Sequence, residues 1–549
     1  MPTIEVSHKD LTRLLGKEIT IEDLENLILH IKGEVDEVLG DIIKIEVKDT
    51  NRPDLWSVEG IVRELKGILG IETGLPSYHI NKGDYTLIVD PNVQEIRPYV
   101  AAAVVKNIKL GKHGFSSLIQ LQEKIMSTFG RKRRKVAIGT HNLDLIKFPV
   151  YYKAVDPDSV KFTPLYESSE MTLREVLDKT ETGRKYKHLL EGMDKYPLLI
   201  DSKGEVISFP PIINSNTIGK ISENTRNIFI DVTGTDLESV SIALNSIVLA
   251  LADRGGEVYS VTIEYSNDVI ETPVIEERKL STSYNKIKRI IGMDLKDSCI
   301  VDLLKKRRLS AEIKDNEITI KYLNYRNDII SAQDVAEEVL IAYGYNKIQP
   351  KTPSIYTKGG LTKRRLLIDK IREIMVGMRA IELYTPVLVS KDVAGSLYDK
   401  KYLIELLNPV STQHNVVRPT LLASFLQILA NNKGIPLPAE FFEVGITAIK
   451  RNLRRIEEWK LFYTYLDSEV SFNLAKEKLE RLFVEIHKKY SLQKTDIKFG
   501  IPGRSGRILI DGVDAGWIAE IHPAILDKLD IDLPMVCFEI SISTLLKLS

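Results

Sequence analysis

The sequence predicts an α+β protein made of several domains, and three observations lead to this fold class. The chain has 549 residues, which is enough for roughly three or four domains of ~150 residues. Hydrophobic residues make up 43% and charged residues 28% of it, as in packed globular proteins. Strand-like runs and helical periodicities alternate along the chain, and a Pro/Gly-containing run over 350–360 predicts a linker before the last segment.

The composition excludes several classes of protein. Lys plus Arg number 76 and Asp plus Glu number 76, so the formal net charge is zero, and any nucleic-acid contact must come from a local patch. The two cysteines, Cys299 and Cys537, exclude a disulfide framework and a cysteine-based zinc site. No apolar run reaches the length of a membrane span and the start of the chain is no secretory signal, so we expect a cytoplasmic protein without membrane contact.

The first domain is expected over 1–80, with mixed strands and helices. Apolar residues at helical spacing predict a helix over 21–29, with Thr20 as its N-cap. Pro53 breaks any helix that runs into it. A second helix is expected from Ser57, and Gly70 ends it.

A second domain is expected over 81–267. Its strands are predicted at 85–89, 98–105, 136–141, 198–201, 206–211 and 227–234, and its helices at 118–129 and 237–254. Polar residues stand at the predicted strand ends, where loop-built sites lie; they are Thr140, His141, Asn142, Ser208, Asn214 and Asp231. No G-x-S-x-G, P-loop, dinucleotide or zinc motif occurs, so a site here is expected to position a water molecule.

A basic run, Arg131–Lys135, immediately precedes one of these strands. Five consecutive cations would neutralise several phosphates of a nucleic acid. The same residues would equally suit an exposed turn or a patch facing an acidic neighbour. The sequence leaves these alternatives open.

A third domain is expected over 268–350 and a fourth over 355–549. The third ends in a helix predicted at 332–343, and four carboxylates stand at its beginning: Asp328, Asp334, Glu337 and Glu338. The last three have the spacing of one helical face. A magnesium ion would offset their repulsion, because it prefers oxygen ligands. A solvated acidic face near the positive end of the helix dipole is the alternative.

Eight stretches, in order from end to end, resemble the β subunits of phenylalanyl-tRNA synthetases of the archaeal and eukaryotic-cytosolic type. They are NRPDLWSVEGIVREL (51–65), KVAIGTHNLDLI (135–146), VISFPPIINS (206–215), FIDVTGTD (229–236), RNDIISAQDVAEEVLIAYGYNKI (326–348), VVRPTLLASFLQILANN (416–432), FFEVG (441–445) and GWIAEIHPAIL (516–526). The resemblance covers essentially the whole chain.

This resemblance implies an N-terminal domain, a B3/B4-type editing domain, a B5 domain and a degenerate class II synthetase-like domain with an antiparallel sheet. It also implies an (αβ)₂ tetramer in which the α subunit joins phenylalanine to tRNA(Phe), with ATP as substrate and a Mg²⁺ ion shared between the subunits. The expected magnesium residues are Asp328, Asp334, Glu337 and Glu338. The last domain is expected to be inactive, because Phe441 stands where class II enzymes have the arginine two positions before Glu443.

The resemblance further implies hydrolysis of tRNA(Phe) mischarged with tyrosine. It assigns Leu199, Ser208 and Asp231 to that editing site, and Thr140, His141 and Asn214 join them because they lie in the same motifs. The family often has an aspartate where this chain has Asn142, which argues against a carboxylate role there. The alternatives are a tRNA-binding and assembly scaffold with an inactive pocket, or an editing protein that works without an α subunit.

Overall fold

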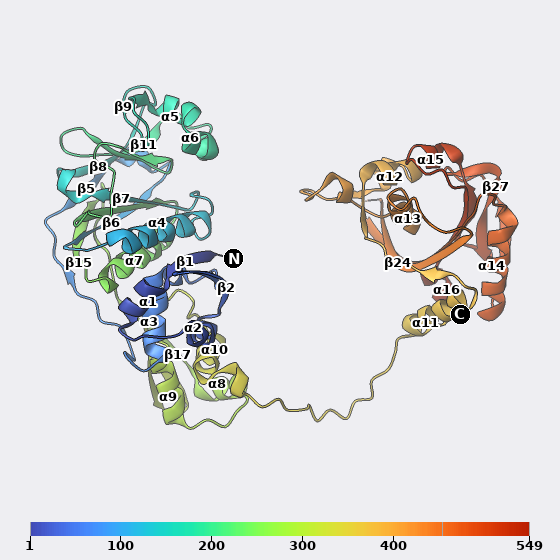
Figure 1. Cartoon of the computed structure of the whole chain (residues 1–549), viewed down its shortest axis with the longest axis horizontal. Coiled ribbons are helices and arrows are strands. Elements are labelled where there is room, and N and C mark those ends of the chain that lie inside the picture. Colours follow the sequence, from blue (N-terminus) through green and yellow to red (C-terminus); the bar gives the residue numbers. More distant parts are fainter. Residues whose placement is uncertain (1, 453, 548–549) are drawn as a thin grey trace. The chain divides into compact units, whose positions relative to one another are not determined.

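The computed structural model describes residues 2–452 and 454–547 and divides into two compact units, Met1–Lys351 and Thr352–Ser549 (Figure 1). The boundary falls inside the predicted linker, and residues 348–362 form no helix or strand. The fold class is confirmed as mixed α+β. None of the helices in the described ranges is long and apolar enough to cross a bilayer.

The beginning of the first unit is a small antiparallel sheet with helices beside it. Its strands are ordered β1-β3-β2 and its elements are β1 (Thr3–Ser7), α1 (His8–Leu15), α2 (Ile21–Ile28), β2 (Gly33–Leu39), β3 (Ile42–Val47) and α3 (Val58–Ile68). Both predicted helices are confirmed, with Thr20 and Ser57 as their N-caps. Each cap hydroxyl accepts a backbone N–H that the first helical turn leaves without a partner.

A larger mixed sheet follows, with strand order β13-β12-β11-β8-β5-β15-β6-β14-β7. Helices α4 and α7 pack on it, α4 against β7 and α7 against β6 and β14 (Figure 1). The elements are β4 (Ile80–Asn81), β5 (Thr86–Val89), β6 (Tyr99–Lys106), α4 (Gly111–Ser127), β7 (Val136–Asn142), β8 (Val150–Val155), β9 (Lys161–Phe162), β10 (Met171–Thr172), α5 (Leu173–Lys179), α6 (Glu181–Tyr186), β11 (Tyr196–Ile200), β12 (Val206–Phe209), β13 (Ile213–Asn214), β14 (Ile228–Gly234), α7 (Leu237–Asp253), β15 (Glu257–Glu264) and β16 (Val269–Thr272).

The predicted strands and the second helix of this region are confirmed, but the helix predicted at 118–129 begins earlier, at Gly111. Its first turns lack apolar periodicity because small residues face the interior there. Ser117 donates a hydrogen bond to Glu59 over 2.8 Å, and Gly114 lies against the side chain of Arg254. Tertiary contacts therefore outweigh the weak helix propensity of this segment.

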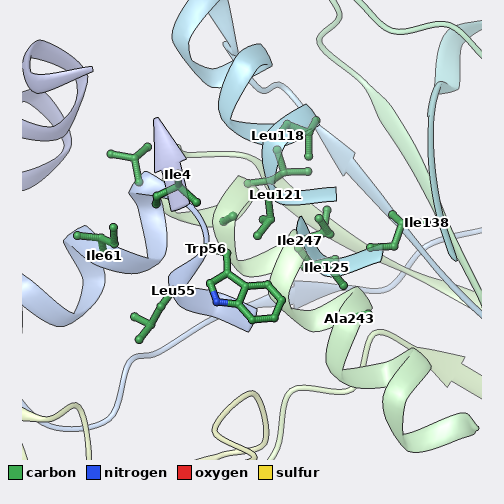
Figure 2. Packing of buried hydrophobic residues seen from close by; sticks show 14 of the residues in the cluster. Ile4, Leu55, Trp56, Ile61, Leu118, Leu121, Ile125, Ile138, Ala243 and Ile247 are labelled. Carbon is green, nitrogen blue, oxygen red and sulfur yellow. The ribbon is translucent and has the colours of Figure 1, made fainter. Parts of the chain in front are cut away.

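One hydrophobic core joins the N-terminal sheet to α4 and α7 (Figure 2). Trp56 is fully buried and stands at the centre of the view. Around it lie Ile4, Leu55 and Ile61 from the first 70 residues, Leu118, Leu121 and Ile125 from α4, Ile138 from β7, and Ala243 and Ile247 from α7. Burying side chains of this size contributes about 1.5–3 kcal/mol each, so the sheet that carries α4 and β7 is anchored to the N-terminal part.

The first unit ends with a small sheet of order β17-β19-β18 and three helices. The elements are β17 (Glu277–Ser283), α8 (Tyr284–Ile291), α9 (Asp297–Lys306), β18 (Ser310–Lys314), β19 (Glu317–Leu323) and α10 (Ala332–Tyr343). The helix predicted at 332–343 is confirmed residue for residue.

The second unit is built on a sheet of order β20-β24-β25-β29-β28-β27-β26, antiparallel except for the pair β20 and β24. Its elements are α11 (Lys363–Gly377), β20 (Ile381–Glu382), β21 (Leu388–Val389), α12 (Lys391–Leu397), β22 (Ile404–Glu405), β23 (Val416–Val417), α13 (Leu421–Leu429), β24 (Ala439–Arg451), β25 (Arg454–Leu466), α14 (Phe472–Glu485), β26 (Ser491–Lys494), β27 (Gly500–Ile510), β28 (Val513–Ile521), α15 (Pro523–Asp527), β29 (Met535–Ser541) and α16 (Ile542–Lys547).

Candidate functional site

A cavity of about 570 Å³ opens beside β7 and the end of β14 in the first unit. Its walls come from α4, from β7, from the turn between β12 and β13, and from the segment 219–223. The lining is predominantly apolar with a few polar groups, and both its size and its character are typical of pockets that hold a small organic group.

Four of the six predicted editing residues line this cavity: Thr140, Ser208, Asn214 and Asp231. Leu199 is fully buried and does not line the cavity, but it lies opposite Ser208 in the pairing of β11 with β12. The structure therefore brings the strand-end residues together, although their roles stay predictions.

The sixth residue, His141, is fully buried and does not line the cavity. Its Nε2 lies 2.5 Å from Oδ1 of Asp231, so the ring fixes the carboxylate of its neighbour. Gly139 makes this pair possible: a Cβ at that position would stand 2.3 Å from Asp231 Oδ1 and 2.4 Å from His141 Nε2. Such contacts are far inside van der Waals distance, so only glycine leaves the pair undisturbed.

Three buried polar atoms of the cavity residues have no hydrogen-bond partner within the described chain: Ser208 Oγ, Thr182 Oγ1 and Arg133 Nε. Buried polar groups are nearly always paired in native proteins, and leaving one unpaired costs about 1–3 kcal/mol. All three atoms belong to residues that line the same cavity.

Sequence reasoning missed Thr182 and Gln122, which also line the cavity. Gln122 exchanges hydrogen bonds with Thr140 Oγ1 at 3.0 and 3.3 Å. A signal for it exists in the sequence, because Gln122 interrupts the apolar stripe formed by Leu118 and Ile125 on α4. Thr182 lies on the short helix α6 and carries no such signal.

The basic run that precedes β7 forms a turn at the rim of this cavity. Arg131, Lys132 and Arg133 have φ values of 51°, 54° and 67°. Left-handed conformation costs about 1–2 kcal/mol per non-glycine residue, so three in succession are unusual. Backbone bonds hold the turn, among them that from the Arg133 N–H to the Met126 carbonyl oxygen at 2.9 Å.

A buried arginine connects this turn to the strand that carries Asp231. Arg97 donates to Thr233 Oγ1 at 2.8 Å and to the carbonyl oxygen of Arg134 at 3.1 Å. Burial lowers the pKa of Arg97 to about 10, while Tyr152 and Asp231 act in the opposite direction. The guanidinium stays charged at neutral pH and lies between the turn and the strand that carries Asp231.

The four carboxylates predicted for magnesium do not converge on one point. Asp328 is held by Arg326, which donates from Nε at 2.8 Å and from Nη2 at 2.7 Å. Oδ2 of Asp334 accepts the backbone N–H groups ahead of α10, at 3.1 and 2.7 Å. Glu337 is half exposed and pairs with Lys32 at 3.1 Å.

The fourth carboxylate, Glu338, is buried, so it is not part of a solvated acidic face. It is 3% exposed and accepts from Arg307 Nε at 2.7 Å, with Arg326 Nη2 at 3.1 Å. Burial by itself raises the pKa of Glu338, but the two guanidinium groups outweigh it and lower that pKa to about 2. Glu338 does lie on the predicted helix, but its partner Arg307 comes from a different part of the chain, which helical spacing cannot reveal.

These contacts bear on whether the four carboxylates can form a magnesium site. Among residues 2–452 and 454–547, no set of three or more His, Cys, Asp or Glu side chains is placed to hold a metal ion. Arginines already neutralise Asp328 and Glu338, so the donor set of this chain does not fit a complete site of its own. The ion pairs instead join the NRPDL segment to α3 and to the loop ahead of α10, because Arg52 binds Asp54 at 2.8 Å, Glu64 at 3.1 Å and Asp328 at 3.8 Å.

Carboxylates are also enclosed in the second unit. Glu443, on β24, is bound by Arg418 Nη1 at 2.8 Å and by the hydroxyl of Thr385 at 2.5 Å. Glu539 accepts from Lys460 at 2.9 Å and from Thr420 at 2.6 Å. Both are less than 3% exposed, so they hold neighbouring segments together rather than face a substrate.

Comparison with known proteins decides the family. Residues 1–70 match the model of the Phe-tRNA synthetase beta subunit B1 domain, 280–345 the tRNA synthetase B5 domain, and 348–542 the phenylalanyl tRNA synthetase beta chain CLM domain. The phenylalanine–tRNA ligase beta subunit of Pyrococcus horikoshii is 41% identical, over 98% of this chain and 99% of the relative. The chain belongs to the phenylalanyl-tRNA synthetase beta-subunit family.

Two further comparisons extend this result. The beta subunit of Methanocaldococcus jannaschii is 39% identical over 99% of this chain and 100% of its own length. A crystal structure of an N-terminal fragment of the phenylalanyl-tRNA synthetase beta subunit from Pyrococcus horikoshii covers 63% of this chain with 47% identity and a TM-score of 0.61. The cavity thus lies in a region shared with beta subunits of this family.

Proposed function

We propose that this chain works as the β subunit of a phenylalanine–tRNA ligase and that its cavity hydrolyses tRNA(Phe) mischarged with tyrosine. Family membership supports the first part. The second part rests on one observation: Ser208, Thr182 and Arg133 each place an unpartnered, buried polar atom around a single, mainly apolar cavity that also contains Asp231.

The need for such a site follows from binding energetics. A pocket shaped for phenylalanine rejects tyrosine poorly, by about 10²-fold, because the two differ by one added hydroxyl. A second site with unpaired polar atoms reverses the preference. Tyrosine completes those atoms, whereas phenylalanine leaves them unpaired at a cost of about 1–3 kcal/mol per group.

In the proposed mechanism the residues bind and orient, and water is the nucleophile. Asp231, fixed by His141, holds the amino acid. Ser208 orients the water or the ester, with Leu199 behind it, and Thr140 and Asn214 complete the wall. The water oxygen bonds to the ester carbonyl carbon, the bond to the ribose oxygen breaks, and that oxygen takes the proton.

The ligase reaction itself is assigned to an α subunit that uses ATP. We propose an (αβ)₂ tetramer in the cytoplasm, with domains at 1–80, 81–267 (B3/B4-type editing), 268–350 (B5) and 355–549 (degenerate class II). The enclosed state of Glu443 and Glu539 supports a structural role for the last domain, together with the missing arginine at position 441. Magnesium enters this proposal only as an ion whose ligand set the α subunit completes, since residues 2–452 and 454–547 hold no full set.

Deacylation tests the proposal. The full chain, co-expressed with its α subunit, is incubated with Tyr-tRNA(Phe), and release of tyrosine is followed. We expect hydrolysis by the wild type and a loss of about 10²-fold in Asp231→Ala, because removal of one partner of a buried charged contact costs about 2–5 kcal/mol. Asp158→Ala is the matched control, because Asp158 is exposed and outside the cavity. Equal rates for Asp231→Ala and the wild type would refute the site, and absence of hydrolysis in every variant would favour the scaffold alternative.

A further inference from the structure

The structure divides the basic run into two groups with different surroundings. Arg133 is turned inward: Nη1 donates to the Ile212 carbonyl oxygen at 2.8 Å, Nη2 to Glu123 at 3.0 Å, and the guanidinium lies 4.4 Å from the ring centre of Tyr186. Lys135 is also engaged, since it pairs with Asp236 at 3.4 Å.

The second group consists of Arg131, Lys132 and Arg134, which are all exposed. Within the described part of the chain, their charged groups form no hydrogen bond or ion pair. The sequence left open whether the run binds a nucleic acid, forms an exposed turn or faces an acidic neighbour. In the structure, Arg133 and Lys135 hold the turn in place, whereas Arg131, Lys132 and Arg134 are exposed.

Hydrogen bonds hold the backbone of the turn that carries these three cations. Its left-handed backbone is held by the bonds of Gly130 to Ile125 and of Lys132 to Ser127, at 2.7 and 3.2 Å. Arg97 binds the carbonyl oxygen of Arg134 from below. Strained backbone persists only where its surroundings over-determine it, and such sites often serve function. The inward Arg133 lines the cavity, so the exposed cations stand at its rim.

We propose that Arg131, Lys132 and Arg134 bind the phosphate backbone of the RNA whose aminoacylated 3′ end enters the cavity. This inference rests on the proposed function. A cavity of about 570 Å³ accommodates one small organic group, so the phosphates of the preceding nucleotides must lie outside it. The whole chain carries no net charge, and therefore the anionic backbone needs a local patch such as this one.

The inference predicts how strongly the affinity for RNA depends on salt concentration. Each phosphate contact made to single-stranded RNA contributes about 0.7 to the slope of log K against log salt concentration. Three contacts contribute about 2. Their removal at ~0.1 M salt is expected to weaken binding by about tenfold to a hundredfold.

The experiment compares the full wild-type chain, with its α subunit, against the triple variant R131Q/K132Q/R134Q. The control is K82Q/K109Q/K203Q, which removes three exposed lysines that do not line the cavity. Two quantities are measured: binding of uncharged tRNA(Phe) by fluorescence anisotropy over a series of salt concentrations, and KM and kcat for deacylation of Tyr-tRNA(Phe).

In the triple variant we expect the slope of log K against log salt concentration to become shallower by about 2. We also expect its KM to rise about tenfold or more, while kcat changes much less. The single variant Lys132→Gln should lose about 0.7, which keeps the test valid if the triple variant folds poorly. An unchanged slope would overturn the inference, and so would a fall in kcat alone or a loss of α-subunit binding with normal tRNA binding. If the wild type does not hydrolyse Tyr-tRNA(Phe), the proposed function fails while the binding curves still decide this inference.

Discussion

Removal of the buried carboxylate of Glu338 tests whether the acidic residues at the beginning of α10 serve folding or metal binding in this chain. Glu338 accepts from Arg307 at 2.7 Å, lies 3.1 Å from Arg326, and is 3% exposed. In Glu338→Ala both guanidinium groups stay buried without this partner. Breaking a buried ion pair in this way costs about 3–5 kcal/mol.

This cost translates into a melting temperature. At about 2.1 cal/mol/K per residue, the unfolding entropy of the unit Met1–Lys351 is on the order of 0.7 kcal/mol/K. A loss of 3–5 kcal/mol therefore lowers the melting midpoint by about 4–7 °C. Calorimetry of the full chain measures it, with and without magnesium in the buffer.

The matched control is Glu337→Ala, one position earlier on the same helix. Glu337 is half exposed and pairs with Lys32 at 3.1 Å, and a surface pair contributes only about 0–1 kcal/mol. Equal effects of the two substitutions would refute the reasoning. So would a Glu338→Ala effect that appears only when magnesium is present, because the carboxylate would then act as a metal ligand.

Three other predictions concern the same groups. Gly139→Ala should abolish deacylation of Tyr-tRNA(Phe) without unfolding the chain, because the new Cβ displaces Asp231 and His141; normal hydrolysis by this variant would contradict it. Arginines hold the pKa values of Asp328 and Glu338 below their usual range. The stability that these two carboxylates give the folded chain is therefore complete above about pH 5 and is lost as the pH falls towards about 2. A urea midpoint of unfolding that stays constant between those pH values would contradict this prediction. Chelation with EDTA should leave the melting midpoint of the chain unchanged when no α subunit is present, and a clear fall would reveal a complete metal site.

Local signals predicted the elements, and long-range contacts explain what the sequence left open. The N-cap Thr20 and the helix that follows Ser57 were predicted from local sequence, and the structure confirms both. Glu338 depends instead on Arg307, a partner 31 positions away, which no periodicity reveals. The seven residues before Leu118 became helical because two of them, Ser117 and Gly114, meet Glu59 and Arg254, contacts that exist only after folding.

The candidate site was also predicted only in part from local sequence. Gly139, which carries no reactive group, explains how its residues are arranged. Ser208 and Asp231 were assigned from motifs on separate strands, yet nothing in either motif says that they share a cavity. The sheet decides this, because β14 pairs with β7 so that Asp231 stands opposite Gly139. Only a residue without a side chain leaves room there for the 2.5 Å contact between Asp231 and His141. Gly139 in one motif and Asp231 in the other therefore belong together, because the Asp231 carboxylate fits only where position 139 has no side chain.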